Sequence, residues 1–385
     1  MNLTDQYAGF NGTGDMLVPN PWRGEAKNII FSDFEWIKSI PGNVYVRLFE
    51  KTIGFEKSSG TTDKKNQPPF PNGYDAYVIS FYLEPVDIEF IDWCAKETSA
   101  PIFVLSDAIV TNYQVPDNII FITYYYWHKQ LDLGMKWFPK QEIKKSVTYK
   151  ASAICNRITQ SKMLITTALL EEFDKKDCMI KLGNWLEEKN VHFREPTGNK
   201  LLDDITDIFW KKYFGTILEI DQFDNHTQNY QKHTINPWIP SLQDVALHFT
   251  NETLAYSYMH NGKNPYIYPG PFLTEKTLKC LLAGTAFVAV GQADTYSSLS
   301  NLGLKFDYNF DLSWDADTGN LSRLSSIIQL ICQLKPYSAM EIFEMTKDST
   351  EHNFDHVWSG EFYQECERYN SKSIEQIFSY FNNSH

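Results

Sequence analysis

The chain has 385 residues, of which 43% are hydrophobic and 15% aromatic, so it is long enough and apolar enough to bury two cores. Its net charge of −13, from 35 basic and 48 acidic side chains, argues against the cationic surface that gives non-specific affinity for nucleic acid. A DNA partner would therefore need a local basic patch.

The cysteines and the N-terminal residues indicate the cellular compartment of the protein. Six cysteines show neither a C-x-x-C motif nor the paired spacing of a zinc site, which predicts reduced thiols. Residues 1–15 lack the charged start and apolar core of a signal peptide. No segment approaches the roughly 18 uninterrupted apolar residues that a membrane span needs. We therefore expect a cytoplasmic protein without a membrane span.

The first part of the chain alternates predicted strands and helices. After an irregular lead-in over 1–27, residues 56–73 are loop-like, and a loop of this length is either functional or disordered. The elements that follow are a strand at 74–82, a helix at 86–97, and strands at 101–105 and 118–123. This alternation predicts a parallel sheet in a Rossmann-like domain. No G-x-G-x-x-G motif follows these strands, so a dinucleotide cofactor is not expected.

A lysine-rich stretch at 129–147 separates this domain from the next, and we place the boundary at 145/146. The local cationic strip consists of Lys129, Lys136, Lys140, Lys144 and Lys145. A second Rossmann-like domain begins with a strand at 147–155, the turn Asn156-Arg157 and a helix from about 161 to 173. An arginine after a strand and before a helix can clamp a phosphate, although it can equally cap the strand end as a surface residue.

The clearest unit in the chain is a helix, a tight turn and a strand at 271–291. Thr274 is a good N-cap, residues 275–282 have helical composition, Gly284 is placed to end the helix, and 286–290 is an apolar strand. The tail, with an acidic stretch at 341–367, is also helical in character.

The first turn of this helix carries Glu275 and Lys276 beside backbone N–H groups that have no helical partner. Such an N-terminus with a lysine attracts a pyrophosphate, and a carboxylate can accept hydrogen bonds from ribose or sugar hydroxyls. Upstream, a strand at 245–250 runs into Asn251 and Glu252, at the kind of strand end where α/β sheets bind ligands. The alternative reading is a helix cap, a dipole-matched acid and a solvated base.

These residues carry a family resemblance. The run L-H-F-T-N-E-T at 247–253, followed by F-L-T-E-K-T-L-K-C-L-L-A-G-T-A-F-V-A-V-G at 272–291, resembles the donor-binding half of two-domain (GT-B type) glycosyltransferases. It is closest to the fucosyltransferase-like group and to related viral and bacterial proteins. The resemblance covers about 245–310, and the C-N-R turn at 155–157 is also similar.

The resemblance implies a fold of two Rossmann-like domains that face a cleft. The first domain, 1–145, would hold the acceptor, and the second, 146–357, would bind the nucleotide-sugar. A C-terminal helix within 358–385 would return to the first domain. If the protein is viral, it would act in the host cytoplasm.

The implied activity is transfer of a sugar from a UDP- or GDP-sugar to an acceptor hydroxyl, with inversion and without a metal or other cofactor. The expected donor-binding residues are Arg157, Asn251, Glu252, Thr274, Glu275, Lys276 and Lys279. The triplet Asp315-Ala316-Asp317 lies in a polar loop, and we interpret it as a solvated turn rather than a divalent-ion site.

The general base in this family is an acidic residue that ends a short apolar strand of the acceptor domain, and P-I-F-V-L-S-D at 101–107 most nearly matches that layout. We therefore favour Asp107, although the family usually has Glu with different neighbours, and a turn cap is the alternative. The other acids in suitable positions are Asp33, Glu35 and Glu84. His128, within an aromatic cluster, fits a core histidine better than a base.

The residues leave two classes of acceptor molecule open. A glycan or small molecule suits the acidic chain, whereas a viral enzyme acting on hydroxymethylated DNA bases would use the lysine strip. The aromatic residues 124–127 would suit stacking on a sugar ring or on a flipped base. Two further alternatives are a nucleotide-sugar isomerase or epimerase and a non-catalytic protein that binds a nucleotide-sugar.

Overall fold

The computed structural model divides the chain into two compact units, drawn from 1–129, 258–270 and 364–385 and from 130–257 and 271–363. The structure describes residues 36, 39, 44–48, 72–81, 86, 88–106, 116–126, 128, 131–132, 135, 140–143, 145–155, 159–182, 196–216, 241–252, 258–261, 264–267, 271, 273 and 275–383.

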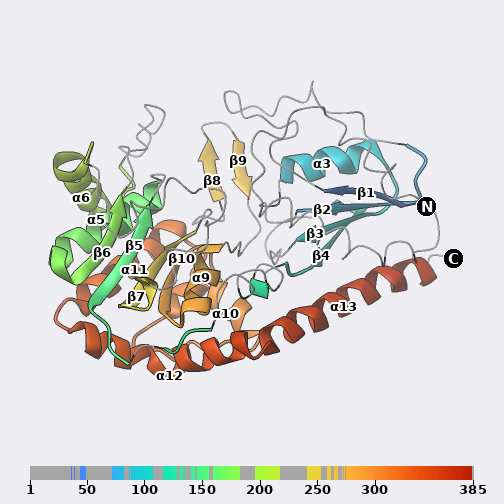
Figure 1. Ribbon diagram of the computed structural model, residues 1–385. Helices are drawn as coiled ribbons and strands as arrows, with labels where there is room; N and C mark the ends of the chain where they lie inside the picture. The colour runs from blue at the N-terminus through green and yellow to red at the C-terminus, as the bar shows by residue number, and fades with distance from the viewer. Residues whose placement is uncertain are drawn as a thin grey trace, which may run out of the picture. The chain divides into compact units, whose positions relative to one another are not determined.

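The first unit contains a four-stranded parallel sheet (Figure 1). Its strands are β1 (Val44–Leu48), β2 (Ala76–Ser80), β3 (Ile102–Ser106) and β4 (Ile119–Thr123). They lie in the order β1-β2-β3-β4, so each new strand is added on the same side of the sheet. Within these four strands the strand order never reverses.

Two helices cover the faces of this sheet (Figure 1). α3 (Ile88–Glu97) packs its Phe90 and Ile91 on one face, against Tyr77 and Ile79 of β2. The other face receives α13 (Glu361–Asn383), whose Ile377 and Phe381 join a core with residues of all four strands. The alternation of side chains along each strand supplies an apolar residue to both faces.

The aromatic residues that follow β4 belong to this core. Tyr124, Tyr125 and Tyr126 are 5%, 2% and 0% exposed, and the Tyr126 hydroxyl lies 2.6 Å from Oγ of Ser80. The prediction that these rings stack on a sugar or a base is therefore wrong for these three tyrosines, because they are buried. Trp127 lies outside the described residues.

The second unit is built around another parallel sheet. Its strands are β5 (Tyr149–Cys155), β6 (Cys178–Leu182), β7 (Val245–Asn251) and β10 (Ala286–Val290), and their order is β10-β7-β5-β6. The chain adds β6 on one side of β5 and then adds β7 and β10 on the other. The strand order therefore reverses between β5 and β7, which is the arrangement of a doubly wound sheet.

Helices surround this second sheet (Figure 1). They are α5 (Gln160–Glu172), α6 (Lys200–Ile208), α9 (Glu275–Ala283), α10 (Thr295–Ser300), α11 (Asn320–Leu334) and α12 (Ala339–Trp358). Short helical turns occur at Lys175–Asp177 and Ser313–Ala316, and a π-helical turn at Phe209–Tyr213. α5 packs on β5 and β6 and is covered by α11, whereas α9 packs on β7 and β10 and against α12.

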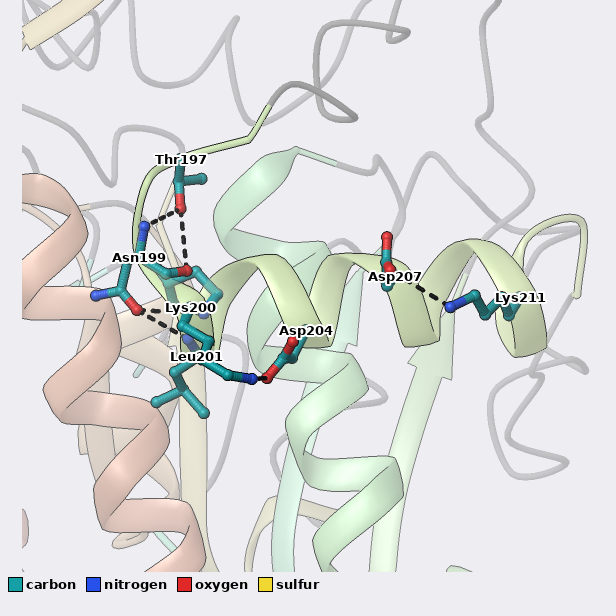
Figure 2. A network of polar contacts seen from close by, with 8 residues as sticks. Thr197, Asn199, Lys200, Leu201, Asp204, Asp207 and Lys211 are labelled. Carbon is teal, nitrogen blue, oxygen red and sulfur yellow. Dashed lines mark hydrogen bonds and ion pairs between the residues drawn. The ribbon is translucent and has the colours of Figure 1, made fainter.

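Local contacts explain where α6 begins (Figure 2). Asn199 is the N-cap, and its Oδ1 accepts hydrogen bonds from the backbone N–H groups of Leu201 and Leu202. Exposed pairs of residues four apart, Lys200 with Asp204 and Asp207 with Lys211, run along the helix surface. These contacts fit a solvated helix face, and each pair adds only about 0.3–0.5 kcal/mol.

The coarse fold prediction is confirmed: the chain is mixed α/β, with a parallel sheet in each of two units. Most predicted strands and helices lie within two residues of the observed bounds. The strands that were not predicted are β1, β6 and an antiparallel hairpin of β8 (Tyr258–Asn261) and β9 (Asn264–Ile267). Among the described helices, none is both long enough and apolar enough to cross a membrane.

Candidate functional site

The carboxyl edge of the second sheet gathers polar side chains at the point where the strand order reverses. β5 ends at Cys155, and β7 ends at Asn251 and is followed by Glu252. In open α/β sheets the loops at such a reversal separate, and ligands bind in the crevice between them. This edge is therefore the candidate site.

Glu252 anchors the side of the edge that α9 covers. Its side chain is buried, and its Oε1 accepts a 2.6 Å hydrogen bond from Oγ1 of Thr277, which is fully buried on α9. Its backbone N–H donates to the carbonyl of Val290 at the end of β10. One residue thus ties together β7, β10 and the start of α9, and it holds a carboxylate at the edge.

Asn251 lies on the α5 side of the same edge. It is 2% exposed, and its Nδ2 lies 3.6 Å from Sγ of Cys155, which in turn lies 3.0 Å from Oγ1 of Thr166 on α5. Burial raises the pKa of the Cys155 thiol. Within the described residues, Oδ1 of Asn251 has no hydrogen-bond partner. A buried acceptor without a donor costs about 1–3 kcal/mol, so this oxygen is a place for a ligand's hydroxyl or N–H.

Arg323 fixes the loop that follows β10. It is 1% exposed, and its Nε donates to the carbonyl of Gly291 at 3.1 Å while Nη1 donates to the carbonyl of Asp317 at 2.6 Å. A Cβ added at Gly291 would lie 3.6 Å from Cγ of Glu252, so this loop passes directly beside that carboxylate. Arg323 lies in the apolar stripe of α11, four residues before Ile327. A charged residue in an apolar stripe is a sign in the sequence that its side chain is buried, and this sign was overlooked.

Asp315 corrects the interpretation of the Asp-Ala-Asp triplet. It is buried, and its Oδ2 accepts hydrogen bonds from the backbone N–H groups of Tyr296 and Ser297 at the start of α10. Burial raises its pKa to about 6 against the lowering effect of those N–H groups. The prediction of a solvated turn is wrong for Asp315 because that carboxylate caps a helix. Within the described residues, no three His, Cys, Asp or Glu side chains are grouped to hold a metal.

A buried histidine lies in the middle of β7. Nδ1 of His248 lies 2.6 Å from Oγ of Ser152 on the neighbouring strand β5. Burial and, to a smaller extent, the positive charge of Lys279 on α9 lower the pKa of His248 to about 3. His248 is therefore neutral at physiological pH.

No family model, curated protein or solved structure matches the chain. Function is therefore inferred from the residues of the sheet edge.

The structure brings together only part of the predicted site. Asn251 and Glu252 lie at the sheet edge, and Lys276 and Lys279 belong to α9, which Glu275 opens. The predicted residues that lie outside the described part of the chain are Asp107, Arg157, Thr274 and the alternative bases Asp33, Glu35 and Glu84.

His128, the remaining alternative base, is described. It is 1% exposed, and its Nε2 lies 2.8 Å from Oε1 of Glu367 on α13. Since α13 packs on the sheet of the first unit, this histidine connects a core helix to that sheet. Its surroundings agree with the interpretation of a core histidine rather than a base.

Proposed function

We propose that the chain is a GT-B type glycosyltransferase that binds a nucleotide-sugar at the carboxyl edge of β5, β7 and β10. The observation that carries this proposal is the buried, unpartnered Oδ1 of Asn251 at the reversal of strand order, in the residue that precedes the buried Glu252. Two acceptors at the edge of a doubly wound sheet suit a ligand rich in hydroxyl groups, and such an edge also suits a phosphate.

Sugar transfer needs two further contributions. The leaving pyrophosphate must be stabilised, and the candidates that the sequence offers are Arg157, Lys276, Lys279 and the helix N-terminus after Thr274, whereas Glu275 would accept hydrogen bonds from sugar hydroxyls. The acceptor hydroxyl must lose its proton as it attacks, and Asp107 is the proposed base. Transfer would then proceed by a single displacement with inversion, without a metal ion.

The proposed acceptor is a glycan or a small molecule. The net charge of −13 disfavours the approach of DNA. Tyr124, Tyr125 and Tyr126, which could have stacked on a flipped base, are buried. In the lysine strip, Lys140 forms an ion pair with Asp355 at 3.2 Å. No observation in the described residues therefore favours the DNA-modifying alternative.

Calorimetric titration with a panel of UDP- and GDP-sugars tests the proposal, with Asn251→Ala compared against Asn301→Ala, a variant at an exposed position of the same unit. We expect wild type and Asn301→Ala to bind one of these donors and Asn251→Ala to bind it at least about tenfold more weakly. No binding by the wild type would refute the proposal. Incubation with the donor and no acceptor then separates a transferase from an isomerase or epimerase, which would convert the donor by itself.

A further inference from the structure

We propose that the nucleotide-sugar crosses the sheet edge in one direction, with its phosphates at the first turn of α5 and its hydroxyl-bearing groups toward Glu252 on the α9 side. This inference rests on the proposed function and adds the orientation of the ligand. It replaces the expectation that the pyrophosphate lies at the start of α9. The two sides of the edge differ in charge.

The two sides are set by the alternation of side chains along β7. Thr250 and Glu252 point toward α9, since Thr277 contacts both of them. Asn251 points to the opposite face, where it contacts Cys155, and Cys155 in turn contacts Thr166 of α5. A ligand in the crevice between β5 and β7 therefore meets α5 on one side and α9 on the other.

The α5 side is positive. α5 is a helix of 13 residues with no acidic residue in its first turn, and it begins at the N-cap Thr159. Lys162 lies in that turn and is only 8% exposed. The backbone carbonyl of Lys162 lies 3.9 Å from Sγ of Cys155, so this residue lies beside the end of β5. Its positive charge lowers the pKa of the Cys155 thiol against the larger effect of burial. A helix N-terminus and a buried ammonium group together favour a phosphate.

On the α9 side the charged residue at the end of β7 is Glu252, whereas the positive charge of Lys279 acts on His248 in the middle of that strand. The carboxylate of Glu252 is 1% exposed, and after burial its charge is the largest influence that raises the pKa of Cys280 on α9. A pyrophosphate beside a buried carboxylate would meet electrostatic repulsion, whereas a carboxylate is a good acceptor for hydroxyl groups. Charge thus assigns the phosphates to α5 and the hydroxyl groups to Glu252.

Asn251 is the second, independent sign of a ligand on the α5 side. Its Oδ1 is buried without a partner, close to Cys155 and therefore to the first turn of α5. The pyrophosphate of a nucleotide-sugar alone would leave this acceptor unsatisfied, because its phosphates are fully ionised at neutral pH and carry no donor. A hydroxyl attached next to the phosphate, as in a ribose or a sugar phosphate, would satisfy it.

The test compares two lysines by calorimetry, with inorganic pyrophosphate, UDP and GDP as probes. Lys162→Met removes the charge at α5, Lys276→Met removes the charge at α9, and Lys176→Met is the control at a lysine whose side chain is 80% exposed. We expect Lys162→Met to weaken binding of the tightest probe about tenfold or more, and the other two variants to weaken it less than about threefold. Lys162→Arg, which keeps the charge, should retain most of the affinity.

A second comparison addresses the hydroxyl side. Glu252→Gln should leave the affinity for pyrophosphate unchanged or higher and should weaken binding of the intact nucleotide-sugar. A loss that follows Lys276→Met rather than Lys162→Met would overturn the orientation while leaving the proposed function standing. Equal affinities of wild type and a folded Lys162→Met would also overturn it. If the wild type binds neither nucleotides nor nucleotide-sugars, both the orientation and the proposed function are wrong.

Discussion

Thr277 of α9 donates a 2.6 Å hydrogen bond to Glu252, the residue that follows β7, and both side chains are buried. This contact joins a helix to the sheet edge through a charged acceptor, and charge-assisted hydrogen bonds are stronger than neutral ones. It also fixes the carboxylate in the position where we propose that the ligand's hydroxyl groups bind.

Removing this donor should destabilise the second unit. Thr277→Val leaves a buried carboxylate with one donor fewer, and we expect a loss of about 1–3 kcal/mol in the free energy of unfolding. The matched variant is Thr285→Val, which removes a buried hydrogen bond to a neutral carbonyl, that of Leu242 at 2.9 Å, and should cost about 0.5–1.5 kcal/mol. Urea unfolding of both variants measures the difference, and equal losses would show that the charge of Glu252 adds nothing.

Asp315 predicts a specific pH dependence. Its folded pKa of about 6 lies above the unfolded value of 3.8, so its protonated form stabilises the fold below about pH 4 and this contribution is lost as the pH rises through about 6. Asp315→Asn cannot ionise and keeps an acceptor for the N–H groups of α10. Between pH 4 and 7 the stability of the variant relative to wild type should therefore rise, by up to about 3 kcal/mol.

Asp317 provides a control, because its effect on stability should change with pH in the opposite direction. Its hydrogen bond with Ser322 lowers its pKa, so its carboxylate stabilises the fold above the unfolded pKa and this contribution is lost on acidification. Asp317→Asn should therefore become less stable relative to wild type as the pH rises from 3 to 6. Thermal unfolding at several pH values measures both variants, and a flat difference for Asp315→Asn would contradict the account of its burial.

Gly303 and Gly360 share a backbone conformation and differ in their surroundings. Both have φ of +87°, but a Cβ at Gly303 would lie 2.6 Å from the ring of His356, whereas nothing lies within 4 Å of a Cβ at Gly360. Hydrogen bonds to the carbonyl of Leu302 and to Glu361 hold that ring in place. Gly360→Ala should cost about 1–2 kcal/mol from backbone strain alone.

Gly303→Ala should cost a further 1–3 kcal/mol or so, since the ring must shift. Chemical denaturation of the two alanine variants measures this difference directly. Equal costs would mean that His356 moves aside freely and that its hydrogen bonds do not fix the ring.

Transfer should survive removal of metal ions. In the proposed site positive side chains and helix N-termini stabilise the leaving pyrophosphate, so EDTA should leave the rate of sugar transfer unchanged within about twofold. The measurement is product formation from the donor identified by calorimetry, with and without EDTA. Loss of activity that manganese restores would show that a metal ion takes part.

Local patterns in the sequence predicted much of the second unit. The strand at 286–290 and the helix from Glu275 are observed, and Gly284 has the positive φ of 64° expected of the residue that ends a helix. These elements have strong signals because apolar periodicity and capping residues coincide. β6, C-M-I-K-L, was missed because a short strand with an internal lysine has a weak pattern.

The composition of the site could be predicted only in part. Asn251 and Glu252 were found because a polar pair directly follows an apolar strand. Lys162 and Arg323 were missed because their importance depends on burial, and burial depends on how α5 and α11 pack on the sheet. The same limit explains the error on Tyr124 to Tyr126, since neighbouring aromatic residues look alike in sequence whether they face a ligand or a core.

The most direct test of the central claim is hydrogen exchange of the wild-type protein with and without the nucleotide-sugar that binds most tightly. Binding at the carboxyl edge predicts slower exchange in peptides that cover 155–163 and 250–253, with little change in peptides from β1 to β4. Protection confined to the strands of the first unit, or to peptides remote from the ends of β5 and β7, would contradict the assignment of the donor site to this edge.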